Sequence, residues 1–199
     1  MIVFPAYASD FEVYPKDGEA YKHLSPLLEG LQQIEFTFHV ENPSVNQGQM
    51  VSDFDEMLEK TLLSAGAECF DLRLPRQIPQ ELDFAFIFRG RRVAVEIEKS
   101  NREKILRDIL KCHMYLQSGA DFAIVGLPRN YPHKLGIWNL YGFGVDRLAE
   151  CKAYGFGTAD KLGKILLLGF TQFDAERHTA LSTKSRQRMR KRAEQAVRG

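Results

Sequence analysis

Bulky apolar side chains recur at every second residue over residues 82–99, on both sides of a short break at Gly90-Arg91. A period of two is the pattern of a β-strand with one buried face, so the stretch predicts a β-hairpin. A two-residue loop with glycine first suits a type II′ turn, which would place Phe88 opposite Val93 and Phe84 opposite Ile97. The apolar face of the hairpin would consist of Phe84, Phe86, Phe88, Val93, Val95 and Ile97.

The other face of this hairpin carries three acidic residues. In the expected register Asp83 lies opposite Glu98, and the small Ala85 lies opposite Glu96. Carboxylates that share a site repel one another and raise each other's pKa unless a cation is supplied. Mg²⁺ binds such carboxylates together with phosphate oxygens and water, and it can activate a water molecule against a phosphodiester. For the hairpin alone, an exposed acidic strand face is an equally good interpretation.

A helix is predicted directly after the hairpin, over residues 101–118, and Ser100 with Glu103 fits a capping box at its start. Its N-terminal N–H groups, together with Arg102 and Lys104, would lie beside the acids, where a phosphate can bind. The apolar stripe of this helix would be Ile105, Ile109, Cys112 and Leu116, with Leu106, Leu110 and His113 beside it. His113 is interpreted as a core residue rather than a metal ligand.

The continuous apolar run at 120–128 predicts a buried strand. A hairpin, a crossover helix and a parallel strand together predict an α/β fold with a central mixed β-sheet flanked by helices. Ser52 and Asp55 fit a second capping box. Further helices are predicted over 17–35, 53–65, 146–152 and 183–197, strands over 36–40, 68–74 and 164–170, and loops over 42–49 and 75–80.

The composition is that of one globular domain spanning residues 1–199. Of the 199 residues, 44% are hydrophobic and 27% are charged, which allows a sizeable core. The apolar run at 165–170 is far shorter than the ~20 residues that a membrane span requires. The first ten residues lack the basic region of a signal peptide, and the three cysteines show no CxxC spacing. We therefore expect a cytoplasmic protein with reduced, mostly buried thiols.

The net charge of +1 conceals an uneven distribution. The C-terminal segment 184–199 contains seven basic residues and one acidic residue, a charge of +6, so the remainder of the chain carries −5. A basic arm on an acidic body favours a polyanionic partner such as DNA, through phosphate neutralisation and counterion release. A solubilising or localising tail is an equally good interpretation of a charge run by itself.

The run from Leu82 to Pro128 resembles the PD-(D/E)xK nuclease superfamily, and within it the BamHI-type restriction endonucleases. The matching features are Asp83, the ExE motif Glu96-Ile97-Glu98, the short turn Ser100-Asn101 and the following strand ADFAIVGLP. The similarity extends more weakly to residues 48–63 upstream and to LLLGF and KSRQRMRKR downstream. It implies a restriction-endonuclease-like fold and a Mg²⁺-dependent type II enzyme that acts as a homodimer on double-stranded DNA at a palindromic site.

The resemblance also implies roles for individual residues. Asp83 and Glu96 would bind Mg²⁺, with the Ile97 carbonyl as a further ligand. Glu98 would help to bind the metal and to orient or deprotonate the attacking water. Glu68 corresponds to an additional upstream acid, for which Glu56 is the rival. DNA contacts are expected from Asn101, Arg102, Lys104, Arg107, Asp146 and Arg147.

Three alternatives remain open. Lys99 would complete an IxK form of the motif, but in a regular strand it points to the same side as Ile97, away from Asp83. Asn101 is also explained as a helix cap and Arg107 as a solvated surface charge. A DNA repair or junction nuclease, and a non-cleaving DNA-binding protein with the same fold, are the alternative functions.

Overall fold

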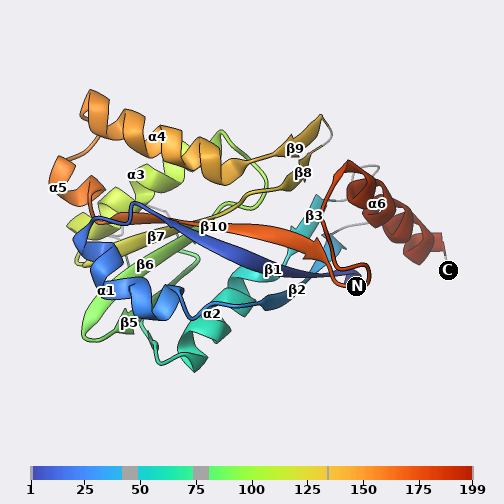
Figure 1. Cartoon of the computed structure of the whole chain (residues 1–199), viewed down its shortest axis with the longest axis horizontal. Coiled ribbons are helices and arrows are strands. Elements are labelled where there is room, and N and C mark those ends of the chain that lie inside the picture. Colours follow the sequence, from blue (N-terminus) through green and yellow to red (C-terminus); the bar gives the residue numbers. More distant parts are fainter. Residues whose placement is uncertain (1, 42–48, 74–80, 134, 199) are drawn as a thin grey trace.

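A nine-stranded mixed β-sheet runs through the molecule (Figure 1). The structure, a computed structural model, describes residues 2–41, 49–73, 81–133 and 135–198. The strands follow the order β3-β2-β1-β10-β7-β6-β5-β4, with β11 paired to β10, while β8 and β9 form a separate ribbon. Strands β6, β7 and β10 are parallel, and the other pairs are antiparallel.

The strands of the main sheet are β1 (Ile2–Tyr14), β2 (Ile34–Glu41), β3 (Gln49–Ser52), β4 (Glu68–Cys69), β5 (Phe84–Phe88), β6 (Arg91–Ile97), β7 (Phe122–Pro128), β10 (Ile165–Asp174) and β11 (Thr179–Ala180). The ribbon consists of β8 (Tyr131–His133) and β9 (Gly136–Trp138). The helices are α1 (Glu19–Leu28), α2 (Phe54–Ser64), α3 (Lys104–Gln117), α4 (Leu140–Tyr154), α5 (Ala159–Leu162) and α6 (Thr183–Arg198).

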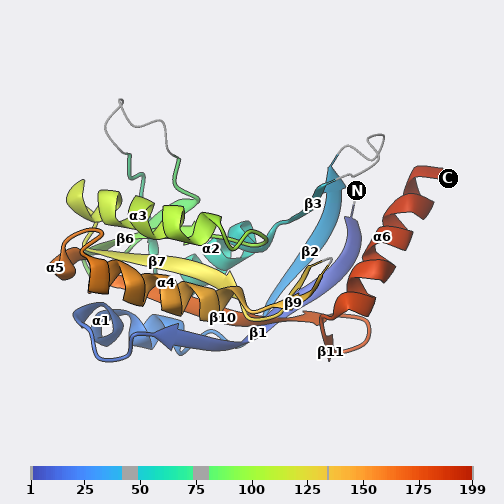
Figure 2. The same cartoon turned by 90° about the horizontal axis from the view of Figure 1, so that it is seen from above.

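Helices cover both faces of the sheet. Helices α1 and α2 pack on one face, in a core that includes Leu24, Leu58 and Val95, and helices α3, α4 and α5 pack on the other (Figure 1). Helix α6 lies at one end of the molecule, beyond β1 and β2 (Figure 2). This arrangement confirms the predicted α/β class with a mixed sheet flanked by helices. None of the described helices is long and apolar enough to span a membrane.

The hairpin is confirmed, but its predicted register is wrong. Phe88 pairs with Arg91 and Phe84 with Val95, so the turn is Arg89-Gly90. Both turn residues have positive φ, 49° and 74°, as a type I′ turn requires and a type II′ turn does not. The error is a shift of two residues. Because side chains alternate with a period of two, the same residues still face the core, where Phe86, Val93 and Val95 are fully buried.

The crossover and the two downstream elements also follow the sequence prediction. Strand β7 is parallel to β6 and follows helix α3, β10 includes the predicted strand 164–170 apart from Lys164, and α6 matches the helix predicted over 183–197. All three cysteines are free thiols, and only Cys69 is exposed. The predicted loops 42–49 and 75–80 lie, apart from Gln49, outside the described residues.

Helix boundaries account for most of the remaining differences. The helix predicted over 17–35 ends at Leu28, and β2 begins at Ile34. Neither capping box forms. Ser52 belongs to β3, and Asp53 instead binds the Thr37 amide at 2.6 Å and the Thr37 hydroxyl at 2.8 Å. Helix α4 begins at Leu140, well before the predicted start, and strand β1 was not predicted.

Candidate active site

A buried ion pair lies between β6 and α3. Glu96 and Lys111 are 3% and 7% exposed, and Lys111 Nζ lies 2.7 Å from Glu96 Oε2. Lys111 also donates a hydrogen bond to the Glu81 carbonyl at 2.6 Å. The pKa of Glu96 is raised to about 8. Desolvation by burial is the largest cause, and the charge of the nearby Asp83 acts in the same direction, whereas Lys111 lowers the pKa. The second carboxylate oxygen, Glu96 Oε1, is buried and has no hydrogen-bond partner among the residues that the structure describes.

Asp83 lies immediately before β5, at the level of Glu96 in the observed register. Its Oδ2 accepts a hydrogen bond of 2.6 Å from the Ile97 amide, which fixes the carboxyl group against β6. Asp83 is exposed at the surface, but desolvation of its carboxyl group by the surrounding atoms raises its pKa. The negative charge of Asp55 acts in the same direction. The observed register therefore places Asp83 level with Glu96, whereas the predicted register had placed it opposite Glu98.

Glu98 is buried and holds the connection between β6 and α3. Its Oε1 accepts hydrogen bonds from the Ser100 amide at 2.8 Å and the Asn101 amide at 2.9 Å. Asn101 in turn accepts from the Glu103 amide at 2.9 Å, an Asx turn just before the helix, whose N-cap residue is Glu103. This network of side-chain acceptors replaces the Ser100 capping box, and it delays the start of α3 until Lys104.

An acidic cleft of about 310 Å³ opens next to Asp83, lined by His39, Asp53, Asp55, Glu56, Glu59, Asp83 and Phe84. Of the two candidates for an additional acid, Glu56 therefore lies in the cleft. Glu68 pairs with Ile87, four residues from Asp83, which is about 13 Å along the strand. Lys99 binds Asp55 at 3.0 Å and the Ser52 carbonyl at 2.9 Å, so it belongs to the wall near α2.

The residues predicted to contact DNA lie on helices α3 and α4 and on the turn before α3. Arg102 is exposed beside α3, and its guanidinium lies over the Trp138 ring at 5.3 Å and the Phe143 ring at 5.5 Å. Lys104 is exposed at the first position of α3, and the exposed Arg107 pairs with the buried Asp108. Asp146 and Arg147 are exposed on α4, where Arg147 pairs with its neighbour Glu150.

Two charged residues of this region were missed by the sequence analysis. Asp108 and Lys111 are buried, whereas Leu106, expected beside the apolar stripe, is 38% exposed. Helix α3 is thus rotated so that Asp108, Lys111 and Tyr115 face the acids. Their spacing of three and four residues was the available signal, because it marks a common helix face. His113 is buried and accepts from the Thr158 amide at 3.1 Å, which is the core role expected for it.

The residues at the hairpin suit a Mg²⁺ ion that takes only a few of its ligands from the protein. Among the described residues no three His, Cys, Asp or Glu side chains are grouped closely enough to enclose a metal ion. Mg²⁺ commonly uses only one or two carboxylates and completes its shell with water and phosphate. Asp83 and the unpartnered Oε1 of Glu96 provide such a pair, and an unpaired buried acceptor requires a partner. The chemistry of these two side chains therefore fits the ion.

The raised pKa of Glu96 makes stability depend on pH in metal-free protein. A carboxyl whose pKa rises from 4.5 to about 8 on folding favours the folded state at low pH, and that contribution is lost as the pH rises towards 8. We expect the free energy of unfolding, measured by urea denaturation in EDTA, to fall between pH 6 and pH 9. Glu96→Gln should flatten this dependence. An unchanged slope in the variant would contradict the assignment.

The comparisons with known proteins give a similarity of fold. No known family matches the sequence, and no curated protein sequence does. Among solved structures, the chain is similar to restriction endonuclease BglII in a complex with a DNA 16-mer, with 15% sequence identity and a TM-score of 0.47. The alignment covers 80% of this chain and 76% of the BglII chain.

Proposed function

We propose that the chain is a Mg²⁺-dependent endonuclease for double-stranded DNA, a type II restriction enzyme of the BamHI type. It acts as a homodimer on a short palindromic site, because two-fold protein symmetry matches two-fold DNA symmetry. Residues 1–199 form the nuclease domain, with 184–199 as its basic C-terminal segment. The observation that carries the proposal is the buried, unpartnered Glu96 Oε1 beside Asp83, at the start of the helix that presents Arg102 and Lys104.

Each residue has a distinct task in this proposal. Asp83 and Glu96 hold the ion, with the Ile97 carbonyl as a further ligand. When bound, Mg²⁺ would supply charge neutralisation at the phosphate and lower the pKa of a water molecule. Glu98 fixes the turn into α3 through the Ser100 and Asn101 amides, and its carboxylate lies on the same strand face as Glu96.

The phosphate would meet the N-terminal end of α3. Lys104 and the neighbouring Arg102 are exposed there, and their positive charges would attract the phosphate together with the positive end of the helix dipole. Arg102 is held by its two aromatic neighbours, Trp138 and Phe143, so less side-chain freedom is lost when it binds. Asn101, Arg107, Asp146 and Arg147 are the proposed contacts to the bases. An Arg side chain recognises guanine, and an Asp side chain accepts from cytosine.

Digestion of plasmid and phage DNA tests this function. With Mg²⁺ we expect discrete fragments, and with EDTA we expect intact DNA. Sequencing of the fragment ends would give the site and the position of the cut. Smeared products or nicks confined to branched DNA would instead identify the repair or junction nuclease, and no cleavage with any divalent metal would exclude a nuclease.

A non-cleaving DNA-binding protein is the second candidate function. The observation in its favour is the Lys111–Glu96 ion pair, which already supplies a positive charge to one of the two carboxylates. Such a protein would bind duplex DNA equally well in Mg²⁺ and in EDTA, and it would leave the DNA intact. Binding followed by electrophoresis of the recovered DNA distinguishes the two candidates in one experiment.

A further inference from the structure

Helix α6 has an inner face that is fixed to the sheet. Ser185 and Met189 are each only 1% exposed. Two arginines on the same side, Arg188 and Arg192, place their guanidinium groups over the Phe4 ring, at 5.8 and 5.4 Å from its centre. Contacts on successive turns of the helix prevent it from rotating about its axis.

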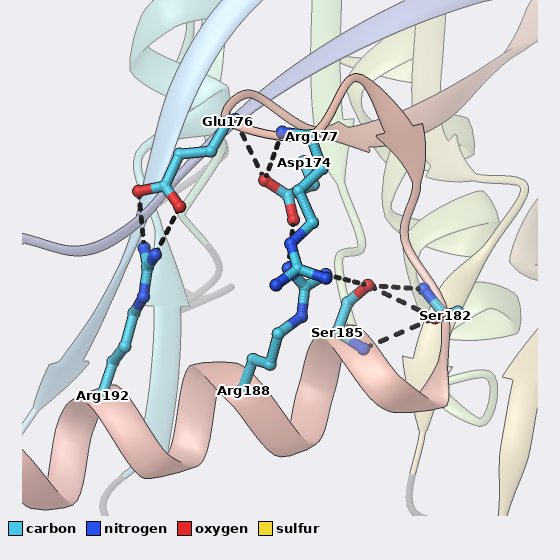
Figure 3. A network of polar contacts seen from close by, with 7 residues as sticks. All are labelled: Asp174, Glu176, Arg177, Ser182, Ser185, Arg188 and Arg192. Carbon is cyan, nitrogen blue, oxygen red and sulfur yellow. Dashed lines mark hydrogen bonds and ion pairs between the residues drawn. The ribbon is translucent and has the colours of Figure 1, made fainter.

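Two acid–base pairs add to this attachment (Figure 3). Asp174, at the end of β10, is fully buried, and its Oδ2 lies 2.8 Å from Arg188 Nη1. Its Oδ1 accepts from the amides of Glu176 and Arg177, at 3.0 and 3.2 Å. Arg192 forms a bidentate pair with Glu176 and lowers the pKa of that carboxyl. The two pairs hold Arg188 and Arg192 on the inner side of the helix.

Further basic residues of α6 lie away from this inner face. Arg186 donates to the Pro132 carbonyl at 3.4 Å, whereas Lys184, Arg190 and Lys191 are exposed. Among the described residues, no acidic side chain forms an ion pair with any of these three. Lys184 and Lys191 are about 10 Å apart along the axis at ~1.5 Å per residue, so both can meet one strand of a polyanion.

We propose that the outer face of α6, defined by Lys184, Arg190 and Lys191, is a second DNA-binding surface that grips the phosphate backbone outside the cleavage site. This inference rests on the proposed nuclease function. The β8–β9 ribbon lies between the helix and the proposed site: Arg186 of α6 contacts β8, β8 pairs with β9, and Trp138 of β9 lies under Arg102.

The chemistry of this face favours a phosphate backbone over a protein partner. Among the described residues, none of the large exposed hydrophobic side chains lies on α6 itself, and Leu135 and Ile137 lie on the neighbouring β8–β9 ribbon. Protein interfaces generally require aromatic or apolar anchors, whereas binding of phosphates requires only correctly placed charges. Because Asp174 and Glu176 hold the inner arginines, the helix is already fixed in place. DNA binding to the outer charges therefore does not require the loss of conformational entropy that ordering a flexible segment would cost.

The experiment compares DNA affinity over a series of salt concentrations in EDTA, where no cleavage occurs, by fluorescence anisotropy with a labelled duplex. The test variant is the triple substitution Lys184→Gln/Arg190→Gln/Lys191→Gln. Since each lost phosphate contact lowers the slope of log K against log salt by about 0.9, we expect the slope to fall by roughly 2–3. Circular dichroism would verify that the variant remains folded.

A matched control carries the same loss of charge elsewhere. Lys16→Gln/Lys22→Gln/Lys152→Gln neutralises three exposed basic residues, one before α1, one within α1 and one in the last turn of α4. Figure 1 shows α1 and the end of α4 that leads to α5 at the opposite end of the molecule from α6, so the salt slope of this control should equal that of the wild type. An equal fall in both triple variants would overturn the proposal, since it would show a general effect of net charge. An unchanged slope in the α6 variant would overturn it as well, as would displacement of DNA by poly-glutamate at equal charge concentration.

Failure of this inference can be separated from failure of the nuclease. If the wild type cuts DNA and the α6 variant binds with unchanged affinity, only the α6 surface is excluded. If the wild type neither binds nor cuts duplex DNA, both proposals fall together. If the α6 variant loses affinity while its cleavage at saturating protein concentration is retained, the surface acts in binding and not in the reaction.

Discussion

Replacing Asp83 by Asn should reduce Mg²⁺-dependent DNA cleavage about a thousandfold, which corresponds to roughly 4 kcal/mol of transition-state stabilisation. Asn keeps the shape of the side chain and can still accept from the Ile97 amide, so the hairpin should remain intact. It removes the negative charge that, with Glu96, would hold the ion. Single-turnover cleavage of a plasmid carrying the site provides the measurement.

The control for this prediction is Asp71→Asn. Asp71 is exposed, pairs only locally with Arg73, and lies outside the acidic cleft, so its loss should leave the cleavage rate unchanged. Duplex binding in EDTA should be the same for both variants or slightly tighter for Asp83→Asn, since one like charge is removed near the phosphates. Wild-type cutting by Asp83→Asn would remove Asp83 from the active site.

Lys111→Met is expected to destabilise the fold by about 1–2 kcal/mol more at pH 9 than at pH 6, because wild type gains by ionising Glu96 beside Lys111 above pH 8, whereas the variant must keep the buried carboxyl protonated. At pH 6 the loss should be small. The pKa of Glu96 is already near 8, and the loss of Lys111 raises it further, so a protonated, neutral carboxyl would remain. Urea denaturation at the two pH values, in EDTA, measures the difference.

A double-mutant cycle identifies the source of this effect. Glu96→Gln/Lys111→Met should recover most of the stability at pH 9, because neither a buried carboxylate nor a buried ammonium remains. If the double variant is as unstable as Lys111→Met alone, the loss comes from packing of the lysine side chain or from the broken bond to the Glu81 carbonyl. Equal losses at pH 6 and pH 9 would lead to the same conclusion.

The faces of the hairpin were predictable, whereas its pairing was not. Alternation identifies which side chains face the core, and a slip of two residues leaves that answer unchanged. The turn type depends on the φ angles of Arg89 and Gly90, and an arginine at positive φ is uncommon enough that the sequence favoured glycine as the first turn residue. The predicted carboxylates therefore lie on one face, but Asp83 is level with Glu96 rather than Glu98.

The sequence could not predict that Lys111 lies at the site, for a different physical reason. Helical periodicity gives the apolar stripe of α3 but leaves the rotation of the helix uncertain by about one residue, or 100°. Only the tertiary packing turns Lys111 and Asp108 inward and Leu106 outward. The capping boxes also failed. Asp53 binds the amide of Thr37, which the tertiary fold brings near and which leaves no local trace in the sequence. Glu98 instead binds the amides of Ser100 and Asn101 directly after it, a local acceptor that takes the place of the Ser100 hydroxyl.

The short bend at Arg89-Gly90 has an influence far from its own position. Its two residues set how far β5 slides along β6, and a slide of one full pleat would exchange the acid beside Asp83 without exposing any core side chain. Packing energy therefore does little to select between the two alignments. The choice of carboxylate partner rests on the backbone preference of two solvent-facing residues at the opposite end of the strands, whose own side chains have no part in the reaction.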